Sequence, residues 1–114
     1  MANFTQHTYD FQAIAGDTWS GVVFTIMVND EPLPLAGATI VAAFQNKSSL
    51  EIERTFTIGD GLEIVDTDGV LMFGGLLMDL THGRYNYDIQ FDLATGERKT
   101  YIGGIATLTK DITP

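Results

Sequence analysis

Apolar and polar residues alternate strictly in a stretch near the end of the chain. Tyr85, Tyr87, Ile89 and Phe91 alternate with polar residues throughout this stretch. A period of two predicts a β-strand with one buried face and one face in water. The segment 92–97 then supplies polar residues and a glycine, which favour a tight turn, and a second extended run follows. The pattern therefore predicts that the chain ends in a β-hairpin.

The rest of the chain also divides into short apolar segments separated by turn residues. We expect strands over residues 8–14, 19–28, 39–45, 51–58, 62–65 and 70–73. A single helical turn is expected over residues 76–80. Strands at spacings of roughly ten residues are typical of a small β-sandwich or barrel. We therefore predict one domain, residues 1–114, with an all-β fold: an immunoglobulin-like antiparallel β-sandwich of about seven to eight short strands.

Two segments, residues 22–28 and 70–78, are apolar at successive positions instead of alternating. A sandwich buries only one face of each strand, so these segments predict that a second surface covers them. We predict a subunit interface; the alternative is a loop of the same chain. The predicted interface residues are Val23, Thr25, Met27, Leu71, Phe73, Leu76, Leu77 and Met78. In segment 51–58, Ile52, Phe56 and Ile58 share one face and are expected to point into the core.

The chain is acidic, with 15 Asp and Glu residues against six Lys and Arg residues and a net charge of −9. Nucleic-acid binding needs clustered cations, so direct contact with nucleic acid is not expected. The absence of cysteine excludes disulfides, thiolate zinc sites and cysteine nucleophiles. Residues 1–6 lack the features of a signal peptide, and no apolar run has the length of a membrane helix. We expect a soluble protein made in a cytoplasm, without membrane contact.

No group of residues predicts catalysis or a bound cofactor. The two histidines, His7 and His82, have no nucleophile motif beside them. The glycine of Asp66-Thr67-Asp68-Gly69 comes too early for a calcium loop, so this motif indicates a hairpin turn instead. Asp88 and Asp92 lie on the polar face of a strand, where carboxylates are expected without a catalytic role. We predict no catalytic residue, no metal ligand and no cofactor, and hence no enzyme; a small β-sandwich hydrolase is a weaker alternative.

Several motifs together resemble a known group of proteins. In chain order they are Ala15-Gly16-Asp17-Thr18-Trp19, Pro34-Leu35-Ala36-Gly37-Ala38-Thr39-Ile40, Gly83-Arg84-Tyr85-Asn86-Tyr87-Asp88-Ile89, Arg98-Lys99-Thr100-Tyr101-Ile102-Gly103-Gly104 and Asp111-Ile112-Thr113. Their order resembles that of small tailed-bacteriophage virion proteins and of the N-terminal domains of phage baseplate upper and tail-fibre-region proteins. The common form has Asp-Leu-Thr-Gly where this chain has Leu33-Pro34-Leu35-Ala36-Gly37, so Pro34 and Ala36 depart from it.

The resemblance implies a virion structural protein that acts through protein–protein contacts. It would be an adaptor or docking subunit of the tail, baseplate or neck region, because the chain ends at Pro114 without the receptor-binding regions of larger relatives. The expected partners are other virion proteins, in a homo-oligomer or symmetric array, and the expected place is the virion, assembled in the host bacterial cytoplasm. The alternatives are a capsid decoration (cement) protein and a carbohydrate- or host-surface-binding module, for which Trp19 and Tyr101 are the candidate aromatic residues if they are exposed.

Overall fold

The computed structural model describes residues 7–110, and these residues form strands and turns without a helix. The described residues therefore contain no helix that is long and apolar enough to cross a membrane. The strands are β1 (His7–Thr8), β2 (Phe11–Ile14), β3 (Thr18–Trp19), β4 (Val22–Thr25), β5 (Met27–Val28), β6 (Glu31–Pro32), β7 (Thr39–Asn46), β8 (Ile52–Ile58), β9 (Gly61–Asp66), β10 (Val70–Phe73), β11 (Leu76–Leu77), β12 (Gly83–Asp92) and β13 (Arg98–Thr109). The all-β prediction is confirmed, and the immunoglobulin-like type stays a prediction.

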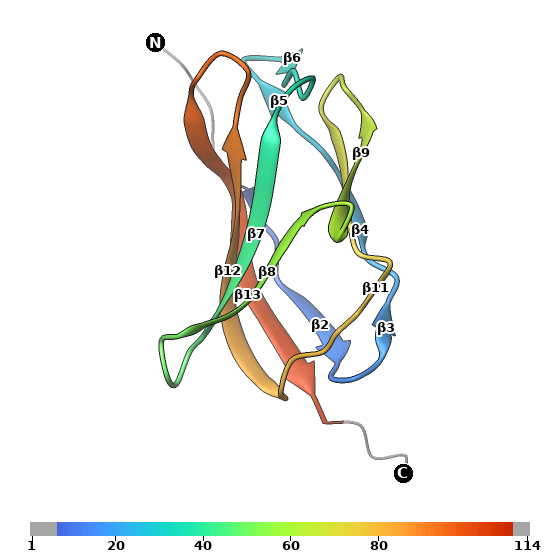
Figure 1. The fold of residues 1–114 in the computed structure, drawn as a ribbon, viewed down its shortest axis with the longest axis vertical. Helices are drawn as coiled ribbons and strands as arrows, with labels where there is room; N and C mark the ends of the chain where they lie inside the picture. Colours follow the sequence, from blue (N-terminus) through green and yellow to red (C-terminus); the bar gives the residue numbers. More distant parts are fainter. Residues whose placement is uncertain (1–6, 111–114) are drawn as a thin grey trace.

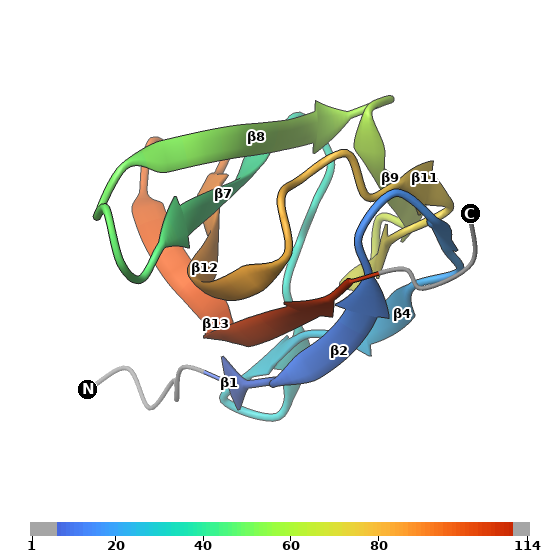
Figure 2. The same ribbon diagram turned by 90° about the horizontal axis from the view of Figure 1, so that it is seen from below.

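One sheet of nine strands carries most of the fold. Its order is β1-β13-β12-β7-β8-β9-β10-β4, and β2 also pairs with β13 (Figure 1). The predicted closing hairpin is β12 and β13, which pair antiparallel from Asp92 opposite Arg98 down to Gly83 opposite Leu108. Figure 2 shows β7 and β8 on one side of the molecule and β13, β2 and β1 on the other. The sheet thus folds over on itself into a sandwich-like pair of layers.

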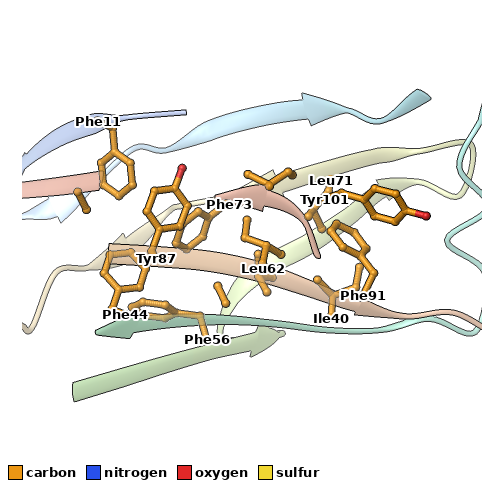
Figure 3. Close-up of a cluster of buried hydrophobic side chains, with 14 of the residues drawn as sticks. Phe11, Ile40, Phe44, Phe56, Leu62, Leu71, Phe73, Tyr87, Phe91 and Tyr101 are labelled. Atoms are coloured by element: carbon orange, nitrogen blue, oxygen red, sulfur yellow. The ribbon is translucent and has the colours of Figure 1, made fainter. Parts of the chain in front are cut away.

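The core lies between these layers and is rich in aromatic rings. The alternating residues of β12 face inward as predicted, and Tyr85, Ile89 and Phe91 are completely buried. Figure 3 shows the rings of Phe44, Phe56, Phe73, Tyr87 and Phe11 gathered at one end of the core. The Phe73 ring lies 5.0 Å from Trp19 and 5.7 Å from Phe56, both measured between ring centroids. Aromatic contacts across layers therefore hold β10 to the rest of the core.

Residues 19–28 do not form the single strand that the sequence predicts. The chain is interrupted at Gly21, whose φ is +95°, and β4 begins only at Val22. Gly21 crosses Gly74 so closely that a Cβ atom on Gly21 would overlap the carbonyl oxygen of Phe73. Only glycine allows two backbones to approach in this way. The crossing separates β3 from β4 and directs them into different sheets.

The helical turn predicted for residues 76–80 is wrong. Leu76 and Leu77 form β11, which pairs antiparallel with β3 so that Leu76 lies opposite Trp19. The N–H of Met78 donates to the carbonyl of Asp17 at 2.9 Å, which continues the same contact. The backbone of this segment thus pairs with β3 instead of forming the hydrogen bonds of a helical turn. Apolar spacing alone does not reveal such a long-range partner.

On β8, only Phe56 reaches the core. Ile52 and Ile58 are exposed, which contradicts the prediction that they point inward. The ladder between β7 and β8 shifts register between Phe44 and Gln45, and β9 pairs with β8 only at Thr57 and Ile58. The register shift thus places Ile52 opposite Gln45, on the outer side of the sheet, whereas the buried Phe44 beside Gln45 faces the core.

The predicted first strand is split in two, and both parts run parallel to β13. Between β1 and β2, Gly104 approaches Tyr9 so closely that a Cβ atom there would overlap the Tyr9 carbonyl oxygen. The Asp10 carboxylate accepts a hydrogen bond from the N–H of Ile105 at 2.8 Å. The Tyr87 hydroxyl donates to the Tyr9 carbonyl. These bonds anchor the N-terminal strands to the hairpin at a point where ladder pairing is interrupted.

Tyr87 gives the protein a specific sensitivity to alkali. Burial, and then the nearby Tyr9 and Asp10, raise the pKa of Tyr87 well above its usual range. The unfolded chain therefore loses this proton at a lower pH than the folded chain does. Stability is unaffected by this group below about pH 10 and falls above it by up to about 1.4 kcal/mol per pH unit. We expect chemical denaturation at pH 9 to 11 to show this fall, and Tyr87→Phe to show a shallower one; equal slopes would contradict the assignment.

Candidate functional site

The predicted interface residues of the apolar segment 22–28 lie on the outside of the molecule. Val23 is 57% exposed, Met27 is 44% exposed, and Thr25 between them is exposed too. The alternate residues Phe24 and Ile26 point inward, and Ile26 is almost completely buried. Residues 22–28 therefore have an inward and an outward side, and only the inward side packs within the chain.

Two neighbouring strands extend this outer surface. Val23 lies opposite Met72 of β10, which in turn lies opposite Glu63 of β9. Thr25 lies opposite Val70 in the same way. Residues paired across strands share one side of a sheet, so these side chains form one continuous surface. Val65 occupies the extra position of a register shift in β9 and is 54% exposed. We call the surface of Val23, Thr25, Val65, Val70 and Met72 the β4–β9 face.

The β4–β9 face ends at an edge of the sheet. Within residues 7–110, β4 is the last strand in the sheet order, and no strand pairs with its outer edge. At the other end of the sheet lie β1 and β2. The two ends meet through side chains, where Tyr9 packs edge-on against Phe24 with 5.5 Å between ring centroids. The unpaired N–H and C=O groups of an edge strand can hydrogen-bond to a strand of another protein.

Negative charge borders this apolar surface. Glu63 and Asp66 of β9 lie in the same cross-strand rows as Met72 and Val70. The sequences of β4, β9 and β10 contain neither lysine nor arginine. The nearest strand with a cation is β8, where Arg54 is already paired with Asp60 and Asp79 at 3.3 Å each. The face is therefore apolar in its centre and acidic along β9, which suits a partner with basic residues beside an apolar centre.

Three predicted interface residues belong to the core instead. Leu71, Phe73 and Met78 are completely buried within the chain, so the prediction that they lie on an outer surface is wrong. In β10 the two-residue period turns Leu71 and Phe73 inward and leaves Val70 and Met72 outside. The side chains of Leu76 and Leu77 lie outside the described part of the structure.

Sequence reasoning missed Val65, Val70 and Met72 as members of this surface. The signal was present in part, because a strict period of two through residues 70–73 puts Val70 and Met72 on one side and Leu71 and Phe73 on the other. Val65 gave no such signal. Its exposure depends on the register shift opposite Val70 and Leu71, which is a property of the paired strands and not of either strand alone.

The residues considered for chemistry do not come together among the described side chains, which do not include that of His7. His82 is exposed, and no group of three His, Asp or Glu side chains suited to a metal ion occurs among residues 7–110. The Asp66 carboxylate accepts the N–H of Asp68 at 2.9 Å, as expected of a turn.

The pair of carboxylates on β12 is also too widely spaced for joint acid–base chemistry. Asp92 is paired with Arg98 at 2.7 Å, while burial raises the pKa of Asp88. Four residues along a strand separate them by about 13 Å, beyond the spacing of a glycosidase pair. These two side chains therefore do not act on one substrate bond.

Of the two candidate aromatic residues for carbohydrate binding, Tyr101 is buried and Trp19 is half-buried against the core. The Trp19 ring stacks on Phe11 with 4.3 Å between centroids, and Tyr101 is buried against Phe91 at 5.5 Å. Burial raises the pKa of the Tyr101 hydroxyl, and the charge of Glu97 raises it further. Neither ring is placed as a flat exposed platform for a sugar. Comparison of the chain with protein-family models and with curated proteins finds no match.

Proposed function

We propose that this protein is a bacteriophage virion structural subunit, a small adaptor or docking piece of the tail, baseplate or neck region. It acts by binding other virion proteins through the β4–β9 face. The resemblance of its ordered motifs to phage virion proteins supports the setting. The observation that carries the docking role is the exposed Val23 of β4, an edge strand of the sheet, beside the half-buried Met72 that lies opposite it on β10.

The β4–β9 face has two properties that favour binding to a protein. Large exposed apolar side chains lose contact with water when a partner covers them, which stabilises the complex. The free edge of β4 adds directional hydrogen bonds, which fix the register of a partner strand. Because Glu63 and Asp66 border the face, a partner with lysine or arginine beside an apolar strand is preferred to another acidic surface. The proposed partner is therefore a different virion protein.

Substitution of Val23 by lysine tests the face. We expect Val23→Lys to weaken binding to the particle by at least about tenfold, equivalent to about 1.4 kcal/mol, because a charge would be buried without a partner. The folding stability should change by only about 0.5 kcal/mol, since Val23 is exposed in the free protein. Thr55→Lys, at an exposed position of β8 where the strand pairs with β7 and not with β9, is the matched control. Equal binding by the two variants would contradict the assignment of this face.

The virion role itself is tested on particles. We expect mass spectrometry of phage particles, purified by density gradient from cells that express the chain, to detect it in constant proportion to the major virion proteins. Particles grown without the chain should then take up the added wild-type protein but not Val23→Lys. Purified particles that contain none of the chain would overturn the proposal, whatever the properties of the isolated protein.

A further inference from the structure

A pocket of about 410 Å³ opens at the end of the molecule where β12 turns into β13. It lies between this turn and the turn that joins β5 to β6, at the upper end in Figure 1. Val28, Pro32, Leu33 and Leu93 give it apolar walls, and the buried Tyr101 also lines it. The volume lies within the range of pockets that hold a small ligand, so an aromatic side chain has room to enter.

The charges at the pocket are mixed. Glu31, Glu97 and Lys99 all line it, so both signs are present. Charge therefore does not select an ionic ligand. The apolar walls favour an uncharged apolar group, which loses contact with water when it enters.

The register of β1 on β13 leads toward this pocket. β1 runs parallel to β13, with His7 opposite Ile102. Because β13 starts beside the pocket, a parallel strand extended toward its own N-terminus runs along β13 to the pocket. Residues 1–6 precede the described part of the chain. Continuing the same register by three residues brings Phe4 opposite Lys99, which lines the pocket.

The sheet faces the core at the level of Lys99. Lys99 lies opposite Phe91 of β12, which is completely buried, and paired residues share one side of a sheet. Relative to β12, β13 has an extra residue at Tyr101, so Tyr101 and Ile102 are both buried although they are successive. A strand that keeps its register with β13 through this point brings the side chain of Phe4 to the core side as well.

The length and composition of the first residues fit the pocket. Three steps of extended chain lead from His7 to Phe4, and three steps of β13 lead from Ile102 to Lys99, about 10 Å in each strand. Residues 1–6 contain no charged side chain, and Phe4 is the only aromatic residue among them. The same segment of a second copy would have to displace β1, which already pairs with β13 at Ile102. These observations favour the chain's own segment as the occupant.

We propose that residues 3–6 continue β1 along β13 and that the Phe4 side chain fills the pocket of its own chain. Phe4 then packs against Leu33 and Tyr101, which adds an aromatic contact to this end of the core. The first residues thereby join the turn between β5 and β6 to the closing hairpin. The contact uses no residue of the β4–β9 face and does not depend on the proposed virion role.

Nuclear Overhauser effects in the full chain test the contact directly. We expect cross-peaks between the ring protons of Phe4 and the methyl groups of Val28, Leu33 and Leu93. In a mixture of isotope-labelled and unlabelled chains, filtered spectra should show none of these cross-peaks between different chains. Spectra without the cross-peaks, or with cross-peaks only between different chains, would overturn the proposal.

Thermal unfolding gives a second, independent readout. We expect Phe4→Ala to lower the midpoint of unfolding by at least about 4 °C, because an aromatic ring is lost from a partly enclosed site. Thr5→Ala is the matched control, because the next residue of an extended segment points to the opposite side. Its midpoint should change by less than about 2 °C. Equal midpoints for the two variants would also overturn the proposal.

Discussion

The Phe73→Ala variant is expected to lose about 3–5 kcal/mol of folding free energy, which is the usual cost of removing a buried phenylalanine ring. Phe73 is completely buried. Its ring lies within 6.3 Å, between centroids, of five others: Phe11, Trp19, Phe44, Phe56 and Tyr87. Because these rings come from both layers, the cavity cannot close by the movement of one side chain. Urea denaturation followed by Trp19 fluorescence measures the loss.

The same variant separates a core role for Phe73 from the interface role that the sequence predicts. A core residue affects the unfolding of the isolated chain, whereas an interface residue affects binding and leaves that unfolding almost unchanged. Met72→Ala is the matched control, because Met72 is the next residue on β10 but lies on the outer side of the sheet. We expect a smaller loss for Met72→Ala, since its side chain is only partly buried. A Phe73→Ala variant no less stable than Met72→Ala would contradict the placement of Phe73.

Gly21→Ala is expected to cost about 2–5 kcal/mol of folding free energy. About 1–2 kcal/mol comes from placing an L-residue at positive φ, and about 1–3 kcal/mol from overpacking. The added Cβ would overlap the Phe73 carbonyl oxygen and the Gly74 Cα. These are backbone atoms, so no side-chain rotation relieves the contact, and the crossing between β4 and the end of β10 must open.

Gly96→Ala isolates the contribution of the crossing. Gly96 has the same φ as Gly21, +95°, but an added Cβ there would meet nothing within 4 Å. The conformational cost is thus shared by the two variants, and only Gly21→Ala adds the overlap. We expect Gly96→Ala to cost about 1–2 kcal/mol. Equal losses in denaturation experiments on the two variants would show that the close approach of the two backbones contributes nothing to stability.

The closing hairpin was the most predictable part of the fold. The alternation allows only one face of the strand to be buried, because shifting the pairing register by one residue would expose Tyr85, Tyr87, Ile89 and Phe91 together. The turn residues at 92–97 then set where the chain reverses. Local pattern and global structure agree here, so sequence alone predicts both the strands and their buried face.

The structures of segments 19–28 and 76–80 depend on contacts with distant parts of the chain, which local patterns do not contain. The apolar run at 19–28 reads as one strand, yet the crossing of Gly21 with Gly74 divides it. The segment at 76–80 has the spacing of a helical turn, yet β3 takes its backbone hydrogen bonds. In each case the deciding partner is about fifty residues away or more along the chain. The sequence correctly marks both segments as apolar, but the secondary structure predicted for each of them is wrong.

The predicted surface residues are divided between the outside and the core for the same reason. Val23, Thr25 and Met27 are exposed, because alternation along one strand decides their side. Successive apolar residues at 70–73 allow either side to face inward, so the sequence did not exclude Phe73 from the surface. That such a surface meets a partner stays a prediction, which the binding of Val23→Lys tests.

The parallel pairing of β1 and β2 with β13 has a consequence for the order in which the protein folds. Phe11 lies opposite Ala106, so the first strands of the described chain find their place only against the last one. On the ribosome, the N-terminal strands emerge long before their partner does. Contacts of such sequence separation slow folding towards the millisecond-to-second range typical of all-β domains. Synthesis of the final strand is therefore the event that allows the start of this chain to fold.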